Sequence, residues 1–150
     1  MELKIPPALV TFFFLAVMWG INYFAHPDIV IFSGMRWVVV FLLGCGGLLG
    51  TAALVQFYRN ATTVNPHSPE NANILVTGGV YRISRNPMYL ALLLLLIGYG
   101  FFLGNSLTFF VPPFFVAYMN RYQLIPEEVV MEERFGAEYS RYKSQVRRWL

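Results

Sequence analysis

The stretch PMYLALLLLLIGYGFFLGNSLTFFVPPFFVAYMNRYQLI, residues 87–125, carries a single charged side chain. It divides into two apolar segments, residues 87–104 and 107–125, each about as long as a helix that crosses the hydrocarbon core of a bilayer. Asn105-Ser106 between them is typical of a short turn, so the segments are predicted to form a tight helical hairpin. Pro112-Pro113 predicts a kink in the second helix of this hairpin.

Two further apolar segments precede the hairpin, at residues 6–25 and 29–58, and the second is interrupted near its start by Arg36. The first ends in INYFAHP, which lacks the small-x-small cleavage site of a signal peptide, so we expect it to remain as a transmembrane helix. The second is long enough to span the bilayer with a tilt. Four transmembrane helices are therefore predicted.

The composition agrees with a membrane protein. Of the 150 residues, 57% are hydrophobic and 13% are charged, whereas soluble domains carry about 25% charged residues. The length allows one domain, residues 1–150. Cys45 is the single cysteine, and neither His26 nor His67 has metal-ligand spacing, so we expect no disulfide framework and no metal.

The second apolar segment contains GCGGLLG, residues 44–50. Its Gly46 and Gly50 have the small-xxx-small spacing that lets helices approach closely, within one chain or in an oligomer. A dinucleotide-binding fingerprint is excluded because Leu49 stands where its third glycine belongs and no strand precedes it.

The last stretch, residues 126–150, is charged, but aromatic and apolar residues recur in it at helical spacing. It is predicted to be an amphipathic helix that lies against the membrane or the bundle. Basic residues favour one side of the four-span arrangement, and Arg36 alone falls near the other. By the positive-inside rule, both termini and this helix are expected in the cytoplasm. The predicted fold class is thus all-α: a polytopic membrane protein with about four transmembrane helices and a cytoplasmic C-terminal amphipathic helix.

One polar patch is LVTGGVYRISRNPMY, residues 75–89. Gly78-Gly79 permits a tight turn, and Arg82 and Arg85 supply positive charge. Asn86-Pro87 suits the N-cap and the first position of a helix, whose N-terminus favours anions. The patch therefore indicates an anion site, although arginines that reach lipid phosphates beside a capped helix would give the same pattern.

A second patch is PEEVVMEERFGAEYSRY, residues 126–142. Its Glu127-Glu128 pair fits the first turn of a helix, where acids complement the helix dipole without any function. The functional interpretation is a carboxylate that holds an ammonium or another cationic group. Together the two patches offer the anion site and the cation site that a zwitterionic amino-acid ligand requires.

At these residues the sequence resembles the isoprenylcysteine carboxyl methyltransferases and their relatives among the phospholipid methyltransferases. The family pattern is roughly G-x-Y-[RK]-x-x-R-[HN]-P-x-Y, a membrane hairpin, then E-E-x-x-L-x-x-x-F-G-x-x-Y-x-x-Y. It is matched here by Gly79, Tyr81, Arg82, Arg85, Asn86, Pro87 and Tyr89, and then by Glu127, Glu128, Phe135, Gly136, Tyr139 and Tyr142. Met131 stands in the leucine position, and Asn86 replaces the histidine common in eukaryotic members.

The resemblance implies a helical membrane fold, here expected in a bacterial inner membrane, that binds S-adenosylmethionine in a cytoplasmic pocket roofed by the C-terminal segment. It implies a lipid-like acceptor that enters from the bilayer between helices; no nucleic-acid partner is expected. The residues expected to bind the cofactor are Gly79, Tyr81, Asn86, Pro87, Tyr89 and Glu128.

The acceptor decides which residues act in catalysis, and both chemistries stay open. A carboxylate acceptor is already ionised, and Arg85 or Arg121 is expected to hold it bidentately. An amine acceptor must lose a proton, for which Glu127, Glu128 or a tyrosine would serve as base. Glu128 is the residue expected to hold the cofactor ammonium.

The competing interpretations are a non-catalytic four-helix membrane scaffold and a small transporter. Proton-coupled exporters need an acid within the membrane, usually in the first span, and residues 6–25 contain none. Weaker candidates for acceptor contacts lie in the polar loop after the second segment: Thr62, Thr63, Asn65 and His67.

Overall fold

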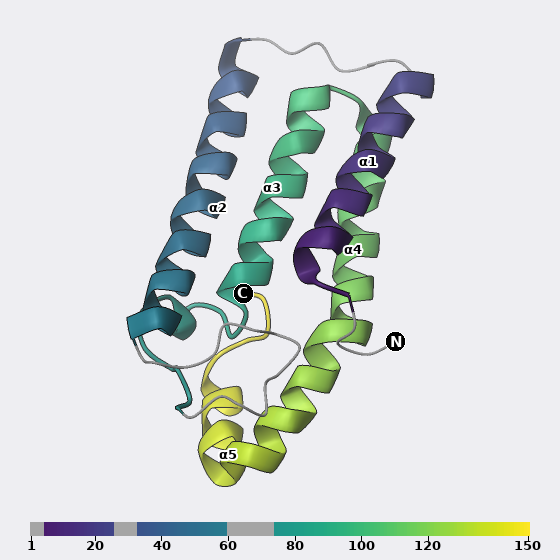
Figure 1. Cartoon of the computed structure of the whole chain (residues 1–150). Helices are drawn as coiled ribbons and strands as arrows, with labels where there is room; N and C mark the ends of the chain where they lie inside the picture. Colours follow the sequence, from purple (N-terminus) through teal and green to yellow (C-terminus); the bar gives the residue numbers. More distant parts are fainter. Residues whose placement is uncertain (1–4, 26–32, 60–73) are drawn as a thin grey trace.

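Apolar helices form a bundle with α3 between its neighbours (Figure 1). The computed structural model describes residues 5–25, 33–59 and 74–150, so the four loop candidates at residues 62–67 lie outside the described residues. The long helices are α1 (Pro7–Ala25), α2 (Ser33–Arg59), α3 (Pro87–Leu103), α4 (Val111–Met119) and α5 (Ile125–Gln145). Within the described ranges every regular element is helical, as predicted.

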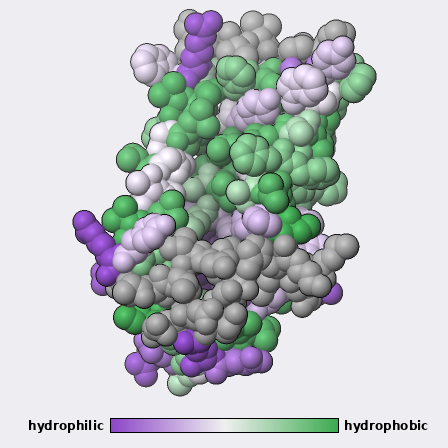
Figure 2. All heavy atoms as spheres, in the orientation of Figure 1, coloured by the Kyte–Doolittle hydropathy of each residue, from purple (hydrophilic) through white to green (hydrophobic). Residues whose placement is uncertain are grey.

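Two helices are long and apolar enough to cross a membrane: α1, with 19 residues, and the 25-residue part Met35–Arg59 of α2. Large apolar side chains on both face outward, among them Phe12 and Phe13 on α1 and Phe41 and Leu48 on α2. Figure 2 shows hydrophobic side chains over the middle of the molecule and hydrophilic ones gathered at the end that holds α5. The chain is therefore a membrane protein, while four complete spans remain a prediction, because α3 has 17 residues and the next segment is composite.

The core joins α1, α3 and α4. Met18, Leu96, Phe115 and Met119 are fully buried and form one cluster. Phe14 meets Phe115 edge to face, with 5.6 Å between the ring centroids. This interlocking of large side chains fixes α3 as the central element on which the neighbouring helices pack.

Glycines bring α2 close to α3. A Cβ atom on Gly46 would lie 3.1 Å from the Ala91 carbonyl oxygen, and one on Gly50 would lie 3.3 Å from the Ala91 Cβ. The close approach predicted from the small-residue spacing is thus made within the chain. Gly46 and Gly50 face α3 and not a second copy, and oligomerisation itself stays a prediction.

The hairpin turn has the predicted place and a distinctive geometry. Gly104 ends α3 in the left-handed conformation, with φ of 65°, and the Asn105 side chain accepts a hydrogen bond from the Leu107 amide at 3.1 Å. The segment predicted over residues 107–125 is helical throughout but changes helix type. It consists of the 3₁₀-helix η3 (Ser106–Phe110), then α4, then the π-helix η4 (Asn120–Leu124).

The prolines and one glycine explain these changes of helix type. Pro112 lies in the first turn of α4, where its missing amide hydrogen costs nothing, so the predicted kink takes the form of a change from 3₁₀ to α geometry. After η4 the chain continues as α5, which is interrupted at Gly136, with φ of 50°. Helix α5 ends at Gln145, so the predicted helix over residues 126–150 is five residues too long.

The apolar face of α5 packs on the bundle. Tyr139 and Tyr142 are buried beside Tyr81, Val76 and Ala53, and Phe135 and Val146 border the same cluster. The apolar face was predicted to pack against either the membrane or the bundle, and in the structure it packs against the bundle. The packing brings the two polar patches of the sequence together.

Candidate active site

A cavity of about 770 Å³ lies between α2, α3, α5 and the segment before α3. Its volume is in the range of small-molecule sites, about 300–1,000 Å³. One end is polar and the other apolar. The polar end is lined by Tyr81, Arg85, Asn86, Tyr89, Glu127, Glu128, Tyr139 and Tyr142. The apolar end is lined by side chains of α2 and α3, including Leu43, Gly46, Gly47, Gly50, Ala91, Leu92 and Leu95.

A second hollow of about 450 Å³ continues the apolar end, because Leu43 and Leu95 line both. Its remaining walls are Leu15 of α1 and Tyr99 and Phe102 of α3. We call the apolar end and this hollow together the apolar groove. Its lining residues come from α1, α2 and α3. Helix α3 lies between the other two (Figure 1).

Glu128 is the centre of a buried ion-pair cluster at the polar end. Arg148 donates two hydrogen bonds to its carboxylate, from Nε and Nη2, each of 2.8 Å. Arg85 Nη1 lies 3.1 Å from Oε1, and Lys143 Nζ lies 3.7 Å from Oε2. Burial raises the pKa of Glu128, but the bonds from Arg148 and the three positive charges outweigh it, so the pKa lies below its usual value.

The residues after α5 return to the bundle and bind the segment before α3. The Arg147 carbonyl accepts a hydrogen bond from the Arg85 amide at 3.0 Å. The Arg148 carbonyl accepts bonds from Ser84 Oγ at 3.2 Å and Asn86 Nδ2 at 2.9 Å. Trp149 Nε1 donates to Asn120 Oδ1 at 3.0 Å. The C-terminal segment therefore holds Arg85 and Asn86 in the wall of the polar end, while the C-terminal residues that line the cavity belong to α5.

Asn86 is the N-cap residue of α3, as predicted, but its side chain makes another contact than the expected cap. It stands at the N-cap of α3, yet its side chain makes no capping hydrogen bond and reaches Arg148 instead. The predicted side-chain cap is therefore wrong. The asparagine ties the start of α3 to the C-terminal segment, which a side chain without an amide donor could not do in the same way.

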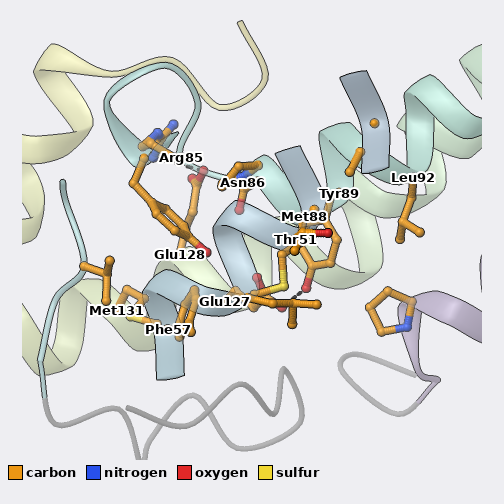
Figure 3. A pocket seen from close by; sticks show the side chains of 18 of the residues that line it. Thr51, Phe57, Arg85, Asn86, Met88, Tyr89, Leu92, Glu127, Glu128 and Met131 are labelled. Atoms are coloured by element: carbon orange, nitrogen blue, oxygen red, sulfur yellow. Dashed lines mark hydrogen bonds and ion pairs between the residues drawn. The ribbon is translucent and has the colours of Figure 1, made fainter. Parts of the chain in front are cut away.

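Glu127 lies in the same cavity in a different environment. It accepts a short hydrogen bond from the Tyr89 hydroxyl, and no basic side chain among the described residues forms an ion pair with it. Burial raises the pKa of Glu127 to about 7; the Tyr89 bond opposes the rise and the charge of Glu128 adds to it. Figure 3 shows Glu127 with Tyr89, Met88 and Thr51, apart from the Arg85–Glu128 pair.

Three tyrosines complete the polar end. The Tyr142 hydroxyl donates a hydrogen bond of 2.7 Å to the Tyr81 carbonyl. Arg85 Nη1 donates a hydrogen bond of 3.4 Å to the Tyr139 hydroxyl. Burial raises the pKa of Tyr139 to about 12 and also raises those of Tyr81 and Tyr142. These hydroxyls are therefore protonated at neutral pH and act as hydrogen-bond donors or acceptors.

Two predicted site residues lie outside the cavity wall. Gly79 begins the 3₁₀-helix η2 (Gly79–Arg82) with φ of 54°, packed against the Gln56 side chain, so it shapes the turn that places Tyr81. Arg121 lies in η4 and is exposed. The cavity brings together the other predicted residues: Tyr81, Arg85, Asn86, Pro87, Tyr89, Glu127 and Glu128.

The sequence pattern of the phospholipid methyltransferase family matches residues 35–138, which are 104 of the 150 residues. The chain belongs to this family. The matched region contains the first polar patch, the hairpin, residues 126–138 of the second patch and the glycine-rich face of α2. The chain is thus a member of a methyltransferase family, and its apolar helices agree with a membrane location.

Two eukaryotic relatives are also methyltransferases. The chain is 30% identical over 128 residues to Protein-S-isoprenylcysteine O-methyltransferase A of Arabidopsis thaliana, over 79% of this chain and 64% of the plant protein. It is 31% identical over 131 residues to Protein-S-isoprenylcysteine O-methyltransferase of Saccharomyces cerevisiae, over 82% of this chain and 54% of the yeast protein. The chain thus spans a little under two thirds and about half of the lengths of these relatives.

A bacterial relative covers a shorter region. The chain is 48% identical over 63 residues to an uncharacterized protein of Haemophilus influenzae, which corresponds to 42% of this chain and the whole of that protein. No solved structure matches the chain.

Sequence reasoning missed several residues of the site. Arg148 and the carbonyls of Arg147 and Arg148 hold the polar end together, but they follow the last family motif and show no periodicity. The apolar wall from α2 was likewise not anticipated as part of the site. Its only signal was the glycine spacing of Gly46 and Gly50, which leaves room beside α3.

Gly79→Ala is expected to lower the unfolding free energy by about 1–2 kcal/mol, because φ of 54° strains a residue with a Cβ atom. The new Cβ would lie 2.5 Å from Gln56 Oε1, the end of a flexible side chain that can shift, so the backbone carries the effect. Gly78→Ala is the matched control, since Gly78 has φ of −88° and also borders Gln56. Unfolding of the two purified variants in detergent measures the difference, and equal losses would contradict the role given to the backbone of Gly79.

Proposed function

We propose that this chain is an S-adenosylmethionine-dependent methyltransferase that acts on a lipid-like, membrane-associated acceptor at the cytoplasmic face. The observation that carries the proposal is the cavity, whose polar end unites both family motifs and whose other end opens into an apolar groove. The arrangement suits a polar cofactor beside a lipophilic acceptor. The basic residues and the Haemophilus relative support a bacterial inner membrane with both termini in the cytoplasm.

The polar end has unused capacity that fits the amino-acid part of such a cofactor. Tyr81 Oη and Arg85 Nε are buried and have no hydrogen-bond partner among the described residues. A carboxylate has about four acceptor positions, and Arg148 and Arg85 use three of those on Glu128 within 3.1 Å. The fourth position, on Oε2, is faced by Lys143 Nζ at 3.7 Å, so a ligand ammonium group would replace this partly exposed side chain there.

The same cluster suits the carboxylate of an amino-acid ligand. Glu128 carries one negative charge, and Arg85, Arg148 and Lys143 surround it with three positive ones. The surplus favours an anionic group nearby, as does the N-terminus of α3, which Asn86 and Pro87 open toward the cavity. The sequence-based expectation that Glu128 and Asn86 contact the cofactor is retained on these grounds.

When bound, the cofactor supplies a methyl group on a positively charged sulfonium. The chain's part is to bind and orient both reactants and to exclude water. Helix α5 and the segment before α3 line the polar end, Arg148 joins the two through Glu128 and Asn86, and apolar side chains of α2 and α3 enclose the rest. Carboxyl methylation, which the plant and yeast relatives suggest by name, would place Arg85 against the acceptor. Arg121, exposed on η4, is too peripheral in the structure to be kept in that role.

Calorimetry with S-adenosylhomocysteine tests the proposal directly. The wild-type protein is expected to bind it saturably, and Glu128→Gln is expected to weaken the binding about 10-fold or more, because a charge-assisted hydrogen bond contributes about 1.5–3 kcal/mol. Glu132→Gln on the same helix is the matched control, since its half-exposed side chain pairs with Lys143 outside the cavity. Unchanged affinity in Glu128→Gln would refute the assignment of Glu128, and absence of binding by the wild-type protein would refute the enzyme.

A further inference from the structure

Helix α2 contains four glycines within residues 44–50, and helix packing accounts for two of them. Gly46 and Gly50 face α3, where a Cβ atom on either would lie within 3.3 Å of Ala91. Gly47 differs, because a Cβ atom there would have no atom of the described residues within 4 Å. Glycine weakens a helix relative to alanine. The missing side chain at position 47 is therefore not required by the packing of these helices.

Gly47 lines the cavity as part of a row of residues along α2. Leu43, Gly47 and Thr51 are four residues apart, so they follow one another on one face of the helix, and all three line the cavity. The Thr51 hydroxyl donates a hydrogen bond of 2.7 Å to the Gly47 carbonyl, which leaves this wall apolar. The row thus has a large side chain at Leu43 and a gap at Gly47.

The gap at Gly47 lies between the polar end of the cavity and the deeper part of the apolar groove. Thr51, one turn toward the polar end, lies near Glu127 (Figure 3). In the other direction, Leu43 lines both the cavity and the hollow that extends to Phe102. A ligand that reaches from the polar end into this hollow therefore passes Gly47 on its α2 side.

We infer that Gly47 is a specificity-determining residue of the acceptor site. The space of its missing side chain lets the apolar tail of the acceptor reach the deeper groove, and so sets the tail length that the site accepts. The inference rests on the proposed function and concerns the tail of the acceptor, whatever its head group.

The level of Gly47 along α3 defines the expected limit. Its neighbour Gly46 lies opposite the turn from Ala91 to Leu95. At 1.5 Å per residue, Leu95 is about 9 Å along α3 from Tyr89 at the polar end, whereas Phe102 is about 20 Å away. A large side chain at position 47 would therefore restrict the site to tails of about the shorter length.

Two alcohols of different length test this limit without turnover. 1-Hexanol and 1-hexadecanol share a neutral head group, and each is titrated into the protein in phosphatidylcholine nanodiscs, with empty nanodiscs as the blank. Gly47→Leu is expected to lower the affinity for 1-hexadecanol about 10-fold and to leave that for 1-hexanol unchanged, because the new side chain overpacks the space that the longer tail needs.

Gly44→Leu is the matched control. Gly44 lies on the same helix and also has no described atom within 4 Å of a Cβ position, but it does not line the cavity. This variant is expected to bind both alcohols like the wild-type protein. The inference is overturned if Gly47→Leu binds 1-hexadecanol as tightly as the wild type, if its affinities for both alcohols fall equally, or if the wild-type protein does not bind 1-hexadecanol saturably.

The unfolding midpoint separates a role in binding from a role in packing. Neither leucine variant is expected to lower the midpoint in the absence of alcohols, because glycine is the weaker helix former and both positions are open. A lower midpoint for Gly47→Leu than for Gly44→Leu would show that the protein's own packing needs the space, and would overturn the inference.

S-adenosylhomocysteine separates the inference from the proposed function. Gly47→Leu is expected to bind it with wild-type affinity, because Gly47 lies in the apolar end of the cavity and the ion-pair cluster of Glu128 in the polar end. Weaker binding by Gly47→Leu would place the gap in the cofactor site and overturn the inference. If the wild-type protein itself does not bind S-adenosylhomocysteine, the proposed function fails, whatever the alcohols show.

Discussion

Replacing Glu128 by methionine will lower the unfolding free energy by about 3–5 kcal/mol, the cost of leaving a buried charge without its partner. The Arg85 side chain is only 8% exposed, so its guanidinium cannot regain in water what it loses from the carboxylate. Arg148 and Lys143 are about one third exposed and can rehydrate, so Arg85 accounts for most of the effect.

The reverse substitution, Arg85→Met, is expected to cost only about 1–1.5 kcal/mol, because Glu128 keeps both hydrogen bonds from Arg148. Unfolding of both variants followed by circular dichroism in one detergent measures this asymmetry. Glu132→Gln, on the exposed side of α5, should change the stability by less than about 0.5 kcal/mol. Equal losses for Glu128→Met and Arg85→Met would show that the cluster behaves as a simple pair.

Stability is expected to depend on pH through Glu127. Its carboxyl has a pKa of about 7 in the folded chain against an ordinary value of 4.5, so the folded state binds more protons than the unfolded state between these values. The unfolding free energy therefore falls as pH rises from 4.5 to 7, by about 3 kcal/mol at 1.36 kcal/mol per pKa unit. Above pH 7 this contribution is constant.

Glu128 acts in the opposite sense. Because its folded pKa lies below the ordinary value of 4.5, its contribution to stability is present above that pH and is lost as the pH falls further. From the two contributions together, we expect the unfolding free energy to be greatest near pH 4.5–5. Denaturation midpoints measured from pH 4 to pH 8 check the profile. Glu127→Gln should remove the decline between pH 5 and pH 7, and a decline that persists in that variant would assign it to another group.

The sequence predicted the elements whose physical signals are local. Runs of apolar residues predicted the helices, and Asn105-Ser106 predicted the turn that Gly104 and the Asn105 side chain make. The two motif blocks predicted the polar end of the cavity, because a hairpin returns the chain to the side from which it started. Burial of Tyr139 and Tyr142 followed from their helical spacing.

What could not be predicted depends on contacts between distant residues. Nothing in the composition of the C-terminal segment shows that the Arg148 carbonyl meets Asn86, or that its side chain meets Glu128. The different environments of Glu127 and Glu128 were equally hidden, since neighbouring residues on a helix point about 100° apart and their partners come from different elements. The exposed position of Arg121 depends on η4, which has no sequence signature.

The apolar groove has a practical consequence for biochemistry on this protein. A detergent with an unbranched alkyl tail has the shape of the chain that the groove is proposed to hold, so every solubilised sample contains a competitor at millimolar concentration. The apparent Michaelis constant for a lipid acceptor would then increase with the amount of detergent, and most steeply for tails that match the length from Tyr89 to Phe102. Steroid-based detergents, whose rigid ring systems differ in shape from an alkyl chain, would leave the constant closer to its value in a bilayer.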